Sequence, residues 1–184
     1  MRVLVLALFC LLAPAPTLAQ QHLPANGVLL VAKPSLTDRN FSQTVVLVSQ
    51  TEDGSTVGVI LNRPTAAKHP QTGETLYSGG PVMREVMVAL FRAEAAPQAP
   101  AFPVLKGVYL TMHPQNIEPL VAQRAGNYRL YRGFSGWAPG QLDGEMQRDG
   151  WYLLPANTGL LFRKDTTGMW DELVRKARGR VALR

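Results

Sequence analysis

The sequence predicts a single α+β domain, with a mixed β-sheet of about six to eight strands and a few short helices. Short runs rich in valine and leucine recur along the chain, and clusters of glycine, proline and polar residues separate them as turns separate strands. A smaller number of short stretches space their apolar residues at helical intervals instead. At 184 residues, the chain has the length of one domain with a sizeable hydrophobic core.

The N-terminus has the layout of a secretory signal peptide. Arg2 gives it a positive head, residues 3–12 form an apolar run that is too short to span a bilayer, and Thr17-Leu-Ala19 offers a cleavage site. We therefore expect residues 1–19 to be removed. This leaves a domain of residues 20–184 in the periplasm or outside the cell, with no transmembrane segment. An uncleaved anchor or a misassigned start codon is the alternative.

Cleavage would change the chemistry that is available to the chain. It would remove Cys10, the only cysteine, so the mature protein would have neither a thiol nor a disulfide. It would also remove one cation, Arg2, so the formal net charge would fall from +6 to +5. The remaining cations cluster only in residues 175–184, which could contact phosphates or an anionic membrane, or could be a solvated helix end. Export argues against nucleic acid as a partner.

The first third of the chain predicts an antiparallel meander. A polar turn at residues 52–55 joins the second and third apolar runs closely enough for antiparallel pairing. Between the first two runs, Ser35 and Asp38 have the spacing of a capping box, which predicts that a helix begins at Ser35. The three strands are expected at residues 28–32, 44–49 and 57–61.

Asn62-Arg63-Pro64 follows the third strand and is the first candidate for a functional site. An asparagine at this position can bond its own backbone and shape a turn. The guanidinium group of Arg63 suits a carboxylate or a phosphate, or it could form a surface ion pair. Residues 66–75 carry no core pattern and are expected to form a loop.

A second turn, Gly79-Gly80-Pro81, precedes the next predicted strand. Paired glycines permit positive φ angles or the close approach of two chain segments, so the turn could line a ligand cleft or only reverse the chain. Residues 93–103 are rich in alanine and proline and are expected to be an exposed connection. Further strands are expected at residues 86–91 and 107–112, and a short amphipathic helix at residues 114–123.

Residues 128–145 are the least ordinary stretch of the chain. Aromatic and apolar residues alternate with arginines up to Phe134, which predicts a strand, and glycines then break it. Pro139 suits the first turn of a following helix. A strand–turn–helix of this kind can direct backbone N–H groups at an anion, with Gln141 adding an amide. It could equally be a tight corner in which Trp137 plugs the core.

A last strand, a turn and a helix complete the predicted chain. The strand is expected at residues 151–154, the turn holds the apolar residues 160–162, and the helix starts at Thr166. The apolar residues of this helix fall on one face, which should pack against the sheet. We expect three tryptophans to be largely buried: Trp137, Trp151 and Trp170.

The sequence holds few residues that are suited to catalysis. Gly133-Phe-Ser-Gly-Trp137 would need glycine in place of Trp137 to be a nucleophile elbow, and no histidine follows Ser135. The histidines of the mature chain have no partner at metal-ligand spacing. We therefore expect no catalytic residue, no metal site and no cofactor.

Four blocks of the sequence, taken in their order along the chain, carry a resemblance to a known family. They are the run from Gly27 to Val48, Gly58-Val-Ile-Leu-Asn-Arg-Pro64, Gly79-Gly-Pro-Val82, and Tyr131-Arg-Gly-Phe-Ser-Gly-Trp-Ala-Pro-Gly-Gln-Leu142. Together they resemble the YqgE/AlgH family, also called UPF0301 or DUF179, and the resemblance extends over residues 27–170. It implies that the sheet is bifurcated and folded into a pseudo-barrel. The leader departs from the family, whose usual members resemble cytoplasmic proteins.

The leading interpretation is a non-catalytic binding or regulatory module of the cell envelope, with a small anion, a peptide or a protein as its partner. The alternative is a hydrolase-like enzyme whose site lies between the Arg63 and Trp137 turns. A concave site at which the three turns rich in glycine and proline converge would suit a carboxylate or phosphate. The candidate ligand-binding residues are Asn62, Arg63, Gly79, Gly80, Trp137 and Gln141.

Overall fold

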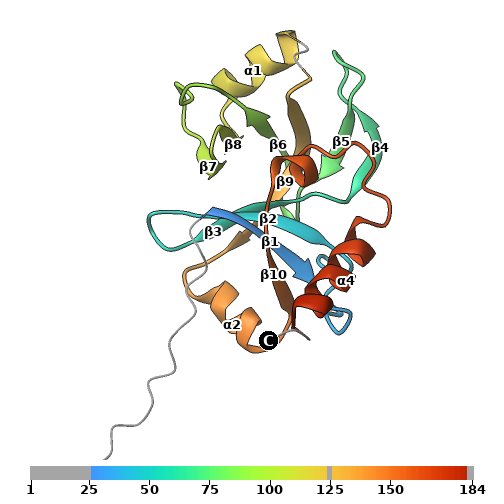
Figure 1. Ribbon diagram of the computed structural model, residues 1–184. Coiled ribbons are helices and arrows are strands. Elements are labelled where there is room, and N and C mark those ends of the chain that lie inside the picture. Colours follow the sequence, from blue (N-terminus) through green and yellow to red (C-terminus); the bar gives the residue numbers. More distant parts are fainter. Residues whose placement is uncertain (1–25, 124–125, 182–184) are drawn as a thin grey trace, which may run out of the picture.

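Residues 26–123 and 126–181 are described by a computed structural model of the chain (Figure 1). The predicted signal peptide, residues 1–19, lies outside these residues. The described chain forms ten strands and four helices. None of these helices combines the length and the apolar composition needed to cross a membrane.

Figure 1 labels the strands and all helices except α3. The strands are β1 (Asn26–Ala32), β2 (Val45–Gln50), β3 (Thr56–Ile60), β4 (Pro64–Lys68), β5 (Thr75–Ser78), β6 (Val82–Arg92), β7 (Phe102–Leu105), β8 (Val108–Thr111), β9 (Tyr128–Trp137) and β10 (Trp151–Pro155). The helices are α1 (Pro114–Gln123), α2 (Gln141–Gln147), α3 (Thr158–Leu161) and α4 (Met169–Val181).

The long strand β9 joins the two halves of a bifurcated sheet. Its N-terminal part pairs with β6 and, in parallel, with β5, whereas its last residues pair with β3. The strand order is β10-β1-β2-β3-β9-β6-β8-β7, and β4 extends the sheet from β5. The end strands β10 and β7 do not pair, so the sheet is not closed, although the Ser49 hydroxyl of β2 donates to the Pro103 carbonyl of β7 (3.1 Å). The predicted α+β class is confirmed.

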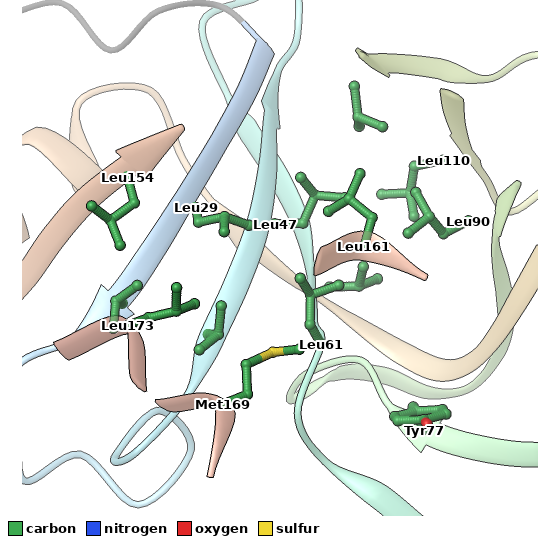
Figure 2. Close-up of a cluster of buried hydrophobic side chains, with 14 of the residues drawn as sticks. Leu29, Leu47, Leu61, Tyr77, Leu90, Leu110, Leu154, Leu161, Met169 and Leu173 are labelled. Carbon is green, nitrogen blue, oxygen red and sulfur yellow. The ribbon is translucent and has the colours of Figure 1, made fainter. Parts of the chain in front are cut away.

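Strands β1 and β2 are buried on both faces, which explains their unbroken apolar sequences. Leu29 of β1 faces the largest core and Leu30 faces a second core on the opposite side of the sheet. The largest core lies between the two halves of the sheet (Figure 2). Leu161 of α3 and Met169 at the start of α4 are fully buried in it, so the C-terminal segment completes this core.

The second core is an aromatic cluster beneath α2. Phe41 stacks on Trp137, with ring centroids 5.5 Å apart, and meets Trp151 edge to face at 5.6 Å. Glu145 of α2 accepts hydrogen bonds from the indole N–H groups of Trp137 (3.2 Å) and Trp151 (3.0 Å). One carboxylate thus satisfies two buried donors and fixes α2 to the sheet.

A third core lies under α1, in the other half of the sheet. Ile117 and Val121, one turn apart on α1, pack with Ala89 and Phe91 of β6 and with Leu130 of β9. The helix predicted for residues 114–123 is therefore confirmed, and its apolar face is the one that the sheet covers.

The three tryptophans are not equally buried. Trp137 and Trp151 are buried, as predicted. Trp170 is only half-buried, and its indole N–H donates to the carbonyl of Ala32 at the end of β1 (2.7 Å). Trp170 therefore ties the start of α4 to β1 while part of its ring stays accessible.

No helix begins at Ser35, so this prediction was wrong. Residues 33–44 form turns. The Asp38 carboxylate accepts the backbone N–H groups of Asn40 (2.8 Å) and Phe41 (3.2 Å). An aspartate that bonds the backbone two residues ahead favours a turn in place of a helix.

Residues 66–75, predicted to be a loop, belong instead to a β-hairpin. In the β4–β5 pairing, Pro64 lies opposite Tyr77 and Lys68 lies opposite Thr75. Every residue of β4 is exposed, so the strand leaves no periodic pattern of apolar residues in the sequence. Its pairing with β5 is what makes it a strand.

Replacing Trp137 with alanine should lower the free energy of unfolding by about 3–5 kcal/mol, because it empties the centre of the aromatic cluster. Urea unfolding, followed by circular dichroism, measures this. As a control, Leu153→Ala removes one of the more exposed large apolar side chains and should change the free energy by less than about 0.5 kcal/mol. A loss below about 1 kcal/mol for Trp137→Ala would contradict the core role of the indole.

Candidate functional site

The side chain of Asn62 reaches back from the end of β3 to the loop before β2. Its Oδ1 accepts the N–H of Val45 (2.9 Å), and its Nδ2 donates to the carbonyl of Gln43 (2.9 Å). Gln43 has a φ of 56°, in the left-handed region that few residues other than glycine adopt. Asn62 therefore holds the loop in a conformation that the loop sequence alone would not favour.

Arg63 binds the same loop a little further from β2. Its guanidinium group donates to the carbonyls of Asn40 (2.5 Å) and Ser42 (3.2 Å). Burial lowers the pKa of Arg63 from its ordinary value, and the nearby charge of Asp38 opposes that shift. We call these four hydrogen bonds of Asn62 and Arg63 the Asn62–Arg63 clamp.

Gly79 and Gly80 lie where the chain after β5 passes very close to β9. A Cβ atom on Gly79 would overlap the carbonyl oxygen of Gly133, and one on Gly80 would overlap the backbone of Phe134. This close approach requires glycine at both positions. The prediction that glycines end this strand after Phe134 was wrong, because β9 continues to Trp137. The glycines of this region accommodate the neighbouring backbone and do not end the strand.

The side chain of Gln141 bonds to groups of its own turn and helix. Its Oε1 accepts the N–H of Ala138 (3.1 Å), and its Nε2 lies 3.5 Å from Glu145 Oε1. The other oxygen of Glu145 binds the Trp137 indole, as described above. Trp137 and Gln141 thus join the end of β9 to α2.

The three turns do not converge on one site. The backbone N–H of Ser78, next to Gly79, donates to the carbonyl of Arg63 (2.9 Å), so the first two turns are neighbours. Trp137, however, pairs with Thr56 at the start of β3, whereas Arg63 follows the end of that strand. The extended chain between Thr56 and Arg63 spans roughly 20 Å. The Arg63 turn and the turn of Trp137 and Gln141 therefore lie at opposite ends of β3.

An open cavity of about 290 Å³ lies beside the Asn62–Arg63 clamp. Its walls come from the loop before β2, the chain after β3 and the start of α4. The lining residues are Gln43, Asn62, Pro64, Thr166, Thr167, Gly168, Met169, Trp170 and Asp171. One of the predicted site residues, Asn62, thus lines the cavity, and Arg63 supports the wall that Gln43 forms.

Polar groups with unused hydrogen-bonding capacity surround this cavity. Thr166 is only 6% exposed, and it lines the cavity. Trp170 and Asp171 belong to the first turn of α4, whose N–H groups have no acceptor within an α-helix. The positive end of the helix dipole lies at this turn. Asp171 is the only carboxylate among the lining residues.

A buried cation lies behind the chain segment that carries Asn62. Arg129 is 7% exposed, and its guanidinium group donates to the carbonyls of Leu61 (3.5 Å) and Arg163 and lies over the ring of Tyr77. In the described part of the chain it pairs with no carboxylate. Burial raises the pKa of the neighbouring Tyr131 to about 12, with the charge of Arg129 opposing the shift. The positive charge of Arg129 is therefore not neutralised locally.

Within residues 26–123 and 126–181, no three His, Cys, Asp or Glu side chains are grouped as metal ligands would be. The cavity offers amide, hydroxyl and backbone N–H groups instead. Groups of this kind bind polar or anionic organic molecules.

Comparison with known proteins identifies the family. A family model described as AlgH-like, DUF179, matches residues 29–182. The chain belongs to this family. A UPF0301 protein of Thermobifida fusca is 34% identical, over 88% of this chain and 91% of the relative. A UPF0301 protein of Mycolicibacterium smegmatis is 32% identical, over 84% of each chain.

Two solved structures share the fold. A crystal structure of a Corynebacterium diphtheriae protein aligns with a TM-score of 0.67 and 25% identity, over 84% of this chain and 88% of the other. The solution structure of AlgH from Pseudomonas aeruginosa aligns with a TM-score of 0.67 and 23% identity, over 84% and 90% of the two chains. The resemblance found in the sequence is thus confirmed, and the second likeness concerns the fold alone.

The sequence of this AlgH-like chain predicts one side of the cavity, through Asn62, and does not predict the other. The sequence around Gln43 does not predict a site residue, because the left-handed conformation of Gln43 is imposed by Asn62, which is distant in the sequence. For the other wall, the sequence predicts only that a helix starts at Thr166-Thr167-Gly168. A run of two threonines and a glycine before an amphipathic helix is typical of a polar helix N-terminus, and this was the available signal.

Proposed function

We propose that this AlgH-like protein is a non-catalytic binding module of the cell envelope, and that its ligand site is the cavity beside the Asn62–Arg63 clamp. The observation that carries the proposal is the cavity itself, whose volume of about 290 Å³ suits a small metabolite. Thr166 supports it, because this largely buried residue lines the cavity and its hydroxyl group can donate to or accept from a ligand there.

The charge around the cavity favours a small anion, such as a carboxylate. The first turn of α4 supplies N–H groups at the positive end of a helix dipole. Arg63 and Arg129, which are bonded to backbone carbonyls next to the lining, add two positive charges. Asp171 in the lining and Asp38 near Arg63 oppose them with two negative charges, so the affinity for an anion should depend on its distance from Asp171.

The predicted site residues take different parts in this proposal. Asn62 contacts the ligand or its hydration shell, because it lines the cavity. Arg63 positions the loop that carries Gln43. The close packing of Gly79 and Gly80 holds the chain next to Arg63.

Small anions should raise the thermal unfolding temperature of the chain that begins at Gln20 in a saturable way. We would titrate succinate, citrate and inorganic phosphate, with the neutral succinamide as the match for succinate, at constant ionic strength. Thr166→Val keeps the shape of the side chain and removes its hydroxyl, so the apparent affinity should fall by about tenfold or more. Asp171→Asn should increase the affinity, because it removes the only carboxylate of the lining.

Thr37→Val is the matched control for Thr166→Val, because Thr37 is exposed and does not line the cavity. It should leave the titration unchanged. A panel without any saturable shift would contradict the site. A ligand that binds wild type and Thr166→Val equally would also contradict it, and a ligand that Asp171→Asn weakens would contradict the anionic class.

The envelope location is a separate proposal, and it rests on the sequence of residues 1–19. Mass spectrometry of the protein from its native host should find a chain that starts near Gln20, in a periplasmic or extracellular fraction. An intact Met1 in a cytoplasmic fraction would contradict export. That result would reopen a regulatory role at nucleic acid.

A further inference from the structure

The C-terminal half of α4 exposes four cations within six residues. We call this surface the α4 basic face, and its members are Arg175, Lys176, Arg178 and Arg180, all of them exposed. Helix α4 lies on the outside of the molecule against β1 and β10 (Figure 1). The face is therefore open to a partner of large size.

The packing of α4 leaves this face no role in the core. Leu173, Val174 and Ala177 are buried on the side of the helix that meets the sheet. With 3.6 residues per turn, the cations of the basic face fall on the remaining, outward side of the helix. The side chains that fix α4 are thus separate from those that carry its charge.

None of the four cations is in a close ion pair with another described residue. The three ion pairs found among the described residues involve none of them, and the pair on α4 joins Glu172, near its start, to Arg163. The helix dipole stabilises cations in the last turn, which explains Arg178 and Arg180. Arg175 and Lys176 lie before that turn, four residues after Asp171 and Glu172, a spacing that stabilises the helix modestly and leaves both cations exposed.

We propose that the α4 basic face binds the surface of a bilayer that contains anionic phospholipids. Each lysine or arginine near such a surface strengthens binding by about fivefold at moderate ionic strength, so four of them suffice for reversible docking. The proposed export would bring the protein next to a membrane. The inference does not depend on the cavity, which lies at the other end of α4.

A bilayer fits this face better than a nucleic acid does. The outward positions from Arg175 to Arg180 carry cations and Gly179, with no aromatic or amide side chain among them. Proteins that bind single strands combine positive charge with aromatic stacking, and those that read duplexes contact the base edges. The α4 basic face provides charge alone, which is sufficient for lipid headgroups and supports only non-specific, salt-sensitive contact with a duplex.

Vesicle co-sedimentation tests the proposal with the chain that begins at Gln20, which contains every described residue. At about 20 mM salt the protein should bind vesicles of phosphatidylglycerol and phosphatidylcholine, and it should not bind pure phosphatidylcholine. Binding should be lost at about 500 mM salt, because the Debye length falls below the width of the face. Arg175→Gln/Arg178→Gln should weaken binding by about 25-fold, two steps of fivefold.

The matched control is Arg39→Gln/Arg84→Gln, which removes the same amount of charge from two exposed residues far from α4 in the sequence. It should weaken binding by less than about threefold, since its charges lie outside the docking face. Thermal unfolding would verify that both variants are folded. Three results would overturn the proposal: no binding to anionic vesicles at low salt, an equal loss in both variants, or tighter binding of duplex DNA than of vesicles through the same arginines.

Discussion

Two adjacent side chains, Asn62 and Arg63, bind three carbonyl groups of the loop that precedes β2 and the first N–H group of β2, and the candidate site depends on this constraint. The loop, residues 33–44, has no helix or strand of its own to satisfy its backbone. A hydrogen bond from a charged guanidinium group contributes about 1.5–3 kcal/mol, and neutral ones contribute about 1 kcal/mol each. These bonds are sufficient to hold one loop conformation, including the left-handed Gln43.

The clamped loop contributes to two separate parts of the protein. Phe41 enters the aromatic cluster with Trp137 and Trp151, and the cluster fixes α2 through Glu145. Two residues later, Gln43 forms a wall of the cavity at the start of α4. The clamp therefore connects the core under α2 to the candidate ligand site. Asn62 and Arg63 thus shape the candidate site although most of their polar atoms are bonded within the protein.

The sequence predicted most strands, because strands buried on both faces carry long apolar runs, as in β1 and β2. It failed at β4, where every residue is exposed, and at Ser35, where Asp38 bonds the backbone of a turn. For the site, the sequence identified Asn62 as a candidate ligand-binding residue whose side chain can bond the backbone and shape a turn. It could not reveal the cavity, because Gln43, Asn62 and Thr166 come together only through the long-range pairing that docks α4 on the sheet.

Amide hydrogen exchange in Asn62 variants tests the clamp most directly. Asn62→Ala removes the acceptor of the Val45 N–H and the donor to Gln43, whereas Asn62→Asp keeps an acceptor for Val45. If the clamp holds the loop as one unit, Asn62→Ala should speed exchange together at Phe41, Thr44 and Val45, by roughly tenfold or more. Asn62→Asp should show a smaller increase. Faster exchange at Val45 alone, with Phe41 and Thr44 unchanged, would contradict the account.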